Sequence, residues 1–325
     1  MIDDLDVSVV LSVYNGAPTL AETLDSILRQ ENVRFELIVI DDGSTDESGA
    51  ILRDHASRDS RIRVLEQENR GLTRSLIRGC SEARAPLIAR HDAGDRSHPE
   101  RLGLQKAAFD EHPGLSFVSS WTDFFGPEWE YLYTEKGTGQ ASGRAIPILD
   151  LGDPKGVIDG PTSHPSVMLR KEAYEEAGGY RAPFAYSQDW DLWYRLATTG
   201  SFLILPRALY DVRVEPAGVS MRNRRAQSRV AEFSLESHRL RQKGKDDAEI
   251  LAAAERVTRQ PPSHSRRRLL AEGNYFIGST LLRNGDRRCR RYLRRAVELD
   301  PLYVRGWIRL AESLFMGEPR ATRDA

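Results

Sequence analysis

The alternation of apolar strands with amphipathic helices in the first 110 residues constrains the fold most tightly. Strands are predicted over residues 7–13, 35–40, 62–65 and 87–89. Helices between them are predicted over residues 19–30, 46–56 and 71–83. The first two strands are rich in β-branched residues and almost continuously apolar, which is typical of strands buried on both faces of a parallel sheet. Right-handed βαβ units are therefore the expected architecture.

Length and composition are those of an ordinary globular protein. With 325 residues, 40% of them hydrophobic, the chain can bury one large core or two modest ones. A formal net charge of -1 argues against general nucleic-acid binding. No apolar run approaches the roughly 20 residues of a membrane span, and no signal-like pattern precedes the first strand. We expect a cytoplasmic protein, soluble or peripheral at the inner face of the membrane, with Cys80 and Cys289 as reduced thiols.

Carboxylates directly follow two of the predicted strands. Asp41-Asp42-Gly43-Ser44 closes the second strand, and Asp92 and Asp95 close the fourth. Ligands in open α/β sheets bind at such carboxyl ends, where acids accept hydrogen bonds from hydroxyl groups or bind a hard cation. Helix capping and turn formation explain the first cluster equally well, and capping also explains Asp95.

The segment after Asp95 is predicted to begin a helix. Residues 97–102 have the pattern of a capped helix start, with Pro99 in the first turn. His91 and His98 flank the acids, and each is more typical of a surface or supporting residue than of a ligand. Short strands are predicted at 117–121 and 167–169, on either side of a Gly- and Pro-rich stretch that suits a substrate cleft.

A further pair of acids lies in a helix predicted over residues 186–196. Asp189 and Asp191 stand between aromatic residues there. In one interpretation both acids favour the positive end of the helix dipole. In the other, one of them is a general base, because a desolvated carboxylate beside aromatic rings has raised basicity. These residues alone favour neither interpretation.

Five motifs follow one another between about residue 6 and about residue 220. They are Val7–Val10 leading into Tyr14-Asn15-Gly16, Ile38 to Asp46, Asp92-Ala93-Gly94-Asp95 with Pro99 and Arg101-Leu102, His164 to Met168 with Gly178-Gly179-Tyr180, and Gln188 to Trp193. In this order they resemble the family-2 glycosyltransferases of the GT-A fold. The resemblance implies a Rossmann-like mixed α/β sheet flanked by helices. It also implies inverting transfer of a sugar from a nucleotide-sugar, with a UDP-sugar as the leading candidate, to a glycan or lipid-linked acceptor.

The resemblance assigns roles to matching positions of this sequence. The nucleotide-binding positions that it implies are Ser12, Tyr14, Asp41, Asp42, Arg70 and Asp92. Asp92 and Asp95 would hold a divalent metal, Mg²⁺ or Mn²⁺, against the diphosphate. Asp189 matches the catalytic base, and His164 and Arg222 match positions near the diphosphate or the acceptor.

Two departures from the family pattern affect these roles. The acidic motif commonly reads Asp, any residue, Asp, Asp, and Gly94 stands at the third position, where the metal ligand usually is. Either Asp92 or Asp95 takes over the metal, a histidine assists, or metal dependence is weak. Gln188 stands where Glu is frequent, next to the retained Asp189.

The last sixty residues resemble a tetratricopeptide repeat with a partial neighbour, starting at about residue 266. The matching small and apolar positions are Gly278, Gly285, Cys289, Leu293, Ala296 and Pro301, if one residue is missing after the turn. Six arginines cover the rest of the helix at 286–299. They form either a solvated face or a surface that attracts anionic lipids, and a single repeat should dock on the catalytic domain or on a protein partner.

We therefore expect a GT-A glycosyltransferase domain over residues 1–220, with a nucleotide-binding half at 1–110 and an acceptor half at 111–220. An all-α extension follows over residues 221–325. The alternative function is a nucleotide-sugar-binding scaffold with little or no activity, which recruits partners through its helical tail and in which Gly94 marks a lost metal site.

Overall fold

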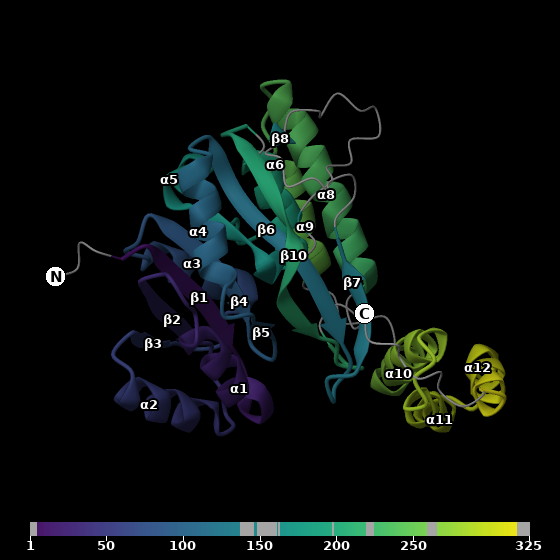
Figure 1. The fold of residues 1–325 in the computed structure, drawn as a ribbon. Helices are drawn as coiled ribbons and strands as arrows, with labels where there is room; N and C mark the ends of the chain where they lie inside the picture. The colour runs from purple at the N-terminus through teal and green to yellow at the C-terminus, as the bar shows by residue number, and fades with distance from the viewer. Residues whose placement is uncertain are drawn as a thin grey trace. The chain divides into compact units, whose positions relative to one another are not determined.

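Two compact units make up the chain. The computed structural model describes residues 5–136, 146–147, 161, 163–196, 198–218, 224–258 and 265–316 (Figure 1). Unit 1 comprises Met1–Thr122, Glu135–Val212 and Ala226–Arg259. Unit 2 comprises Asp123–Thr134, Arg213–Arg225 and Gln260–Ala325. The domain boundary expected at residue 220 stays a prediction.

A mixed sheet is centred in unit 1. Its order among the described residues is β3-β2-β1-β4-β9-β6-β10-β5, with β7 beside β6 and β8 beside β10. The strands are β1 Val7–Val13, β2 Phe35–Asp41, β3 Ile62–Glu66, β4 Leu87–Asp92, β5 Arg96–Ser97, β6 Leu115–Phe125, β7 Tyr131–Glu135, β8 Ile146–Pro147, β9 Met168–Arg170 and β10 Ser201–Arg213. β1 is parallel to β2 and β4, whereas β9 is antiparallel to β4 and β6. The predicted mixed α/β sheet is confirmed.

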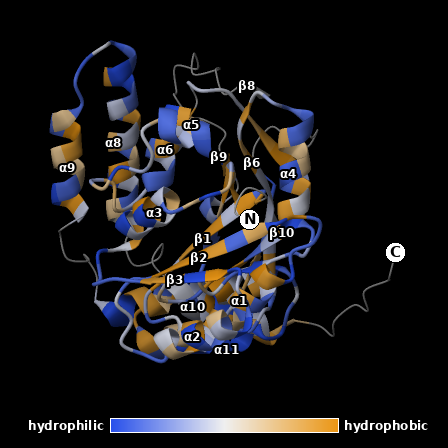
Figure 2. Cartoon of the chain, turned by 90° about the vertical axis from the view of Figure 1, so that its left-hand side faces the viewer, coloured by the Kyte–Doolittle hydropathy of each residue, from blue (hydrophilic) through white to orange (hydrophobic). Residues whose placement is uncertain are grey.

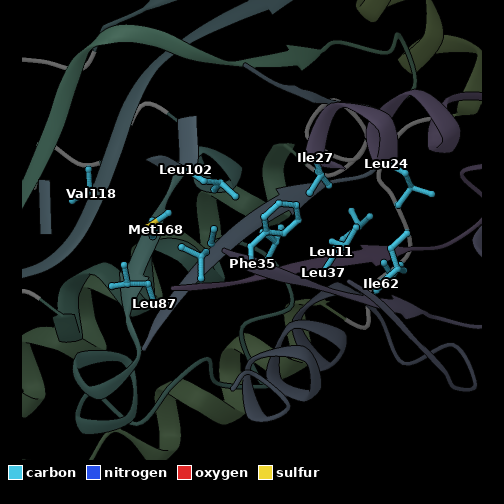
Figure 3. Close-up of a cluster of buried hydrophobic side chains, with 14 of the residues drawn as sticks. Leu11, Leu24, Ile27, Phe35, Leu37, Ile62, Leu87, Leu102, Val118 and Met168 are labelled. Carbon is cyan, nitrogen blue, oxygen red and sulfur yellow. The ribbon is translucent and has the colours of Figure 1, made fainter. Parts of the chain in front are cut away.

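Helices pack on both faces of the sheet, and successive residues of β1 contact helices on opposite faces. Unit 1 contains α1 Ala17–Leu28, α2 Ser48–Arg58, α3 Leu72–Ser81, α4 Arg101–Glu111, η1 His164–Ser166, α5 Lys171–Glu176, α6 Gln188–Leu196, α8 Arg224–Gln242 and α9 Ala248–Thr258. Leu11 packs with Leu24 of α1 (Figure 3), whereas Val10 packs with Leu76 of α3. Because neighbouring side chains point to opposite faces, β1 is buried on both, and its hydrophobic colouring in Figure 2 reflects this. No described helix is both long and apolar enough to cross a membrane.

The turn between β4 and α4 differs from the predicted one. Arg96–Ser97 forms β5, which pairs with β10, and α4 begins only at Arg101. The predicted capped helix start at Ser97 is therefore wrong. The physical reason lies in distant partners, because the Ser97 backbone N–H donates to Ser26 Oγ at 3.1 Å and its hydroxyl accepts from Arg101.

The buried side chain of Arg101 ties the segments around this turn together. Its guanidinium donates to the carbonyl oxygens of Arg90 at 2.9 Å and Pro165 at 2.8 Å, and to Ser97 Oγ at 2.9 Å. These acceptors lie in β4, η1 and β5. Burial lowers the pKa of Arg101 to about 10, so the group remains charged at neutral pH.

The described part of unit 2 contains three helices and the turn of the β6–β7 hairpin. The helices are α10 Arg266–Arg283, α11 Cys289–Leu299 and α12 Val304–Leu314. Leu132 of β7 packs in one apolar cluster with Ile277 of α10 and Leu293 of α11. Glu130 is fully buried, accepts a hydrogen bond from Tyr292 Oη at 2.7 Å and pairs with Arg291. A buried carboxylate thus joins the hairpin turn to α11.

Replacement of Arg101 by Met tests the importance of its hydrogen bonds. The variant leaves two buried carbonyl groups without their donor, and we expect it to lose about 3–5 kcal/mol of unfolding free energy. Urea denaturation measures this loss. Arg58→Met is the control, because the ion pair of Arg58 with Asp54 is exposed and should contribute less than about 1 kcal/mol. Equal losses in the two variants would contradict the assigned role.

Candidate active site

Two loops at the carboxyl ends of β1 and β2 are fastened to each other. Asn15 Oδ1 accepts a hydrogen bond from the Thr45 backbone at 2.8 Å. Ser48 Oγ, at the start of α2, accepts one from the Gly16 backbone at 2.9 Å. The two crossover loops therefore form one connected rim at this edge of the sheet.

Ser12 and Tyr14, both predicted to hold the nucleotide, lie at this end of β1. In the parallel register Ser12 stands opposite Ile40 of β2 and Asp92 of β4. Tyr14 follows the strand, and 53% of its surface is exposed. An exposed ring at the strand end is available to pack on a flat ring of a ligand.

Asp42 holds the loop that was predicted to form another wall of the nucleotide site. Its buried carboxylate accepts hydrogen bonds from Gln67 Nε2 at 2.6 Å and from the backbone N–H groups of Arg70 and Gly71, both at 2.9 Å. Asp41 accepts one backbone hydrogen bond at 2.9 Å from the turn that follows it. The structure thus brings Asp42 and Arg70 together. The carboxylate of Asp42 mainly holds the loop at residues 67–71 in place, and Arg70 itself is exposed.

Arg90 is a buried cation at the centre of the site. Its terminal nitrogens pair with both carboxylate oxygens of Asp92, at 2.8 and 3.1 Å. Its charge also acts on the Asp189 carboxylate and on the His164 ring. Arg90 Nε is buried and has no hydrogen-bond partner within the described part of the chain. The guanidinium of Arg90 therefore interacts with Asp92, predicted for the donor site, and with Asp189, predicted as the base.

The other acid of this loop, Asp95, is held by a tyrosine. Asp95 is buried, and its Oδ2 accepts a hydrogen bond from Tyr210 Oη at 3.0 Å. The same hydroxyl accepts one from the Asp92 backbone at 3.1 Å. His91 lies beside them with Nδ1 2.9 Å from the Asp92 carbonyl oxygen, and burial holds the pKa of His91 well below its usual value. The histidine is therefore neutral at physiological pH.

Gly94 occupies a backbone conformation that is strained for other residues. Its φ is +101°, which L side chains rarely adopt, and its N–H donates to Thr23 Oγ1 at 2.9 Å. An added Cβ would meet only Thr19 Oγ1 at 3.6 Å, so the backbone and not the available space restricts this position. The aspartate that is usual in the family would be strained here.

The donor atoms of this loop do not fit the predicted Mg²⁺ or Mn²⁺. Asp92 is engaged by Arg90, Asp95 accepts from Tyr210, and Gly94 offers no carboxylate. Within the described ranges, no group of three or more His, Cys, Asp and Glu side chains is placed to hold a metal ion. Metal binding through Asp92 and Asp95 accordingly finds no support in the side-chain arrangement.

The two acids of α6 have different environments. Asp191 is fully buried and pairs with Arg181 and with Arg195 Nη2, the latter at 2.6 Å. Asp189 is only partly exposed, and the surrounding protein raises its pKa by desolvation, an effect that the positive charge of Arg90 opposes. Asp191 therefore anchors the helix through its ion pairs, whereas desolvation favours the protonated form of Asp189.

His164 faces the same region from η1. Its Nε2 lies 2.6 Å from Tyr180 Oη, and its ring meets the Trp193 ring edge-on at 5.7 Å. Burial, with the charge of Arg90, holds the pKa of His164 well below its usual value, so the ring is neutral. Gln188 is buried at the start of α6. Arg222 lies outside the described residues.

Arg90 and Tyr210 were not predicted as site residues. Arg90 lies within an apolar strand, where the hydrophobic pattern indicates core, although an arginine inside a buried strand generally needs a carboxylate partner. That requirement was a usable signal, since Asp92 is two residues away. Tyr210 comes from β10 and is separated from Asp95 by 115 positions, so no local pattern identifies it.

The order of the strands and the helices that flank the sheet are those of the GT-A glycosyltransferase fold. The crystal structure of Staphylococcus aureus TarS 1-349 in complex with UDP-GlcNAc is similar, with a TM-score of 0.54. The match covers 94% of this chain and 89% of that one, at 17% sequence identity. At this identity the likeness shows the fold alone.

Sequence comparison places the chain in a family. The profile described as Glycosyl transferase family 2 matches residues 8–178. The putative glycosyltransferase EpsE of Bacillus subtilis (strain 168) is 34% identical over 213 residues, which are 64% of this chain and 72% of EpsE. Glycosyltransferase GlyG of Streptococcus pneumoniae serotype 4 is 40% identical over 90 residues, 27% of this chain and 30% of GlyG. The chain belongs to glycosyl transferase family 2, and the predicted enzyme class is confirmed.

Replacement of Gly94 by Ala tests the strained backbone of the acidic loop. A φ of +101° is costly for alanine, so we expect a loss of about 1–3 kcal/mol in unfolding free energy. Gly114→Ala is the matched control, because an added Cβ there has nothing within 4 Å. The control should change stability by less than about 1 kcal/mol. Equal effects at the two positions would show that the loop has another conformation.

Proposed function

We propose that this chain is an inverting glycosyltransferase that transfers a sugar from a UDP-sugar to a hydroxyl group of a glycan or lipid-linked acceptor, in the assembly of a cell-surface polysaccharide or glycan. The observation that carries the proposal is the environment of Asp189, a desolvated carboxylate at the start of α6 with a raised pKa. TarS, which shares the fold, was crystallised with UDP and with UDP-GlcNAc, and this supports the choice of UDP.

The chemistry follows from the placement of the acids. Asp189 accepts the proton of the acceptor hydroxyl while the acceptor oxygen bonds to the anomeric carbon of the sugar. The bond from that carbon to the diphosphate oxygen breaks on the opposite face, which inverts the configuration. Asp92 accepts hydrogen bonds from the ribose, and Arg90 holds the Asp92 carboxylate in place.

The nucleotide would occupy the rim at the ends of β1 and β2. Tyr14 packs on the base, Ser12 and Asp41 provide polar groups at the strand ends, and Arg70 lies on the loop that Asp42 holds. His164, neutral and hydrogen-bonded to Tyr180, lies on the acceptor side. Arg222 remains assigned to the diphosphate by family resemblance.

The variant Asp189→Asn tests the base. It should lower turnover by about 10²–10⁴-fold while leaving UDP affinity nearly unchanged, because the amide cannot accept the proton. Release of UDP from a panel of UDP-sugars measures turnover, and calorimetry measures UDP binding. Asp54→Asn, at an exposed position of α2, is the control. Wild-type turnover by Asp189→Asn would remove Asp189 as the base.

The pH dependence provides a second test of Asp189. The carboxylate must be ionised to accept a proton, and desolvation raises its pKa. The turnover rate should therefore fall as the pH falls through this raised pKa, at a pH above the value of about 3.9 that is usual for Asp. A pH–rate profile measures the midpoint, and a midpoint at or below the usual Asp value would contradict the assignment.

Titration of UDP with and without Mn²⁺ tests the metal and the scaffold alternative. Because Asp92 and Asp95 already have protein partners, we expect Mn²⁺ to change the UDP dissociation constant by less than about tenfold. A larger effect would show that Asp92 leaves Arg90 when the donor binds. UDP binding without any release of sugar from the panel would favour the scaffold.

The helical tail is proposed to be tetratricopeptide-like, and close helix packing supports this. A Cβ added at Gly278 of α10 would lie 2.8 Å from Leu293 Cγ of α11, so only glycine allows this approach.

Most of the arginines of this region have partners within unit 2. The pairs are Arg288 with Asp286, Arg290 with the Ser313 carbonyl, Arg291 with Glu128 and Glu130, and Arg295 with Glu298. Peripheral attachment to an anionic membrane through these arginines stays a prediction.

A further inference from the structure

The helices α8 and α9 lie beside α6, the helix that carries Asp189 (Figure 1). Phe184, in the loop that leads into α6, is fully buried in one apolar cluster with Val230 of α8 and Ala254 of α9. Thr73 Oγ1 of α3 donates a hydrogen bond to the Phe184 carbonyl oxygen at 2.9 Å. The loop before α6 is therefore packed against two helices that come after β10 in the chain.

A largely buried network of charges joins α6 to α8 and to the start of α9. Its central group is the guanidinium of Arg181, which is 18% exposed. Arg181 Nε donates to Asp191 Oδ2 of α6 at 3.0 Å, and Nη1 donates to Asp247 Oδ2, directly before α9, at 2.6 Å. Arg181 Nη2 donates to Ser237 Oγ of α8 at 2.8 Å, and this hydroxyl donates to Asp247 at 2.5 Å. One cation thus contacts groups from three helical segments.

The turn before α6 makes a separate hydrogen bond to α8. Ser187 Oγ donates to the Gln227 carbonyl oxygen at 3.0 Å. The φ of Ser187 is +51°, in the left-handed region that residues other than glycine seldom adopt. Residues 177–187, all described, form no helix or strand between α5 and α6. The conformation of this turn therefore depends on contacts such as that of Ser187.

The C-terminal half of α6 packs on the sheet. The Trp193 ring stacks on the Phe117 ring of β6, with 4.9 Å between the ring centroids, and Leu196 is buried in the same apolar cluster. The polar contacts with α8 and the start of α9 instead involve Ser187 and Asp191, which stand two residues before and two residues after Asp189. Loss of these contacts should therefore loosen the end of α6 that carries Asp189.

We propose that these polar contacts with α8 and α9, which we call the α6 clamp, position Asp189, and that Asp247 is a positioning residue that acts through Arg181. The inference rests on the proposed role of Asp189 as the base. A base must lie within hydrogen-bond distance of the acceptor hydroxyl, and a displacement of about 1 Å can lower a rate by about 10²-fold. The proposed nucleotide site at the ends of β1 and β2 contains no residue of the clamp. The clamp should therefore affect turnover and leave UDP affinity unchanged.

Replacement of Asp247 by Asn in the full chain tests the clamp by turnover. The amide keeps the size of the side chain and removes the charge that pairs with Arg181. The rate of UDP release from UDP-sugars, divided by the number of UDP sites from calorimetry, gives the turnover per site. We expect this turnover to fall by at least about tenfold, with UDP affinity within about twofold of the wild type. A merely destabilised chain would lose UDP sites and keep the turnover of each remaining site.

Asp246→Asn is the matched control, because Asp246 is exposed and accepts a hydrogen bond from the Ala248 backbone of its own turn. It should keep the wild-type turnover per site. Ser187→Ala removes the hydrogen bond to Gln227 and should lower turnover per site by about threefold or more. This milder variant decides in the same way if Asp247→Asn does not fold. Wild-type turnover per site in Asp247→Asn, or an equal loss in Asp246→Asn, would overturn the proposal.

Hydrogen–deuterium exchange tests the clamp without relying on activity. In Asp247→Asn, amide exchange over residues 188–196 should be at least about threefold faster, with β1 unchanged, because the start of α6 opens locally more often. Exchange at the wild-type rate over these residues would overturn the clamp. Faster exchange with unchanged turnover per site would refute the positioning of Asp189 by Asp247. A wild type that releases no sugar from any donor would instead refute the proposed function, and the exchange rates would still decide the clamp.

Discussion

The buried guanidinium of Arg101 is the interaction on which the shape of the site depends. Burial of a charge is costly unless the group is paired or hydrogen-bonded, and the main acceptors of Arg101 are backbone oxygens of β4 and η1. The same group lies 4.7 Å from the centre of the Tyr210 ring, whose hydroxyl in turn holds Asp95. Arg101 thereby fixes three parts of the site. They are the acidic loop after β4, the segment that contains His164, and the distant strand β10.

The helix α6 shows that two acids of one motif can lie in different environments. Asp191 is neutralised by two arginines inside the protein, as a structural interpretation requires. Asp189, two residues earlier, is instead desolvated, which raises its pKa, and the charges of Arg90 and Asp92 act on it. The distinction depends on Arg181 and Arg195, whose positions relative to the two acids cannot be read from the motif itself.

Local pattern predicted the sheet well, because β1 and β2 are marked by continuous apolar runs and closed by polar turns. The start of α4 was missed, because Ser97 is bound to Ser26, which is 71 positions away. The same limit applies to the site. Acids at strand ends are visible in the sequence, but the groups that engage them, such as Tyr210 for Asp95, come from distant strands.

The buried carboxylate of Glu130 makes the helical tail part of the packing of the β6–β7 hairpin. Glu130 belongs to the hairpin that interrupts the catalytic fold, yet its hydrogen-bond partners Tyr292 and Arg291 come from α11. A shortened chain that lacks the tail would expose apolar Leu132 and leave an acid without its counter-charge. The hairpin and the tail are therefore one unit of stability, in which each supplies the partners of the other.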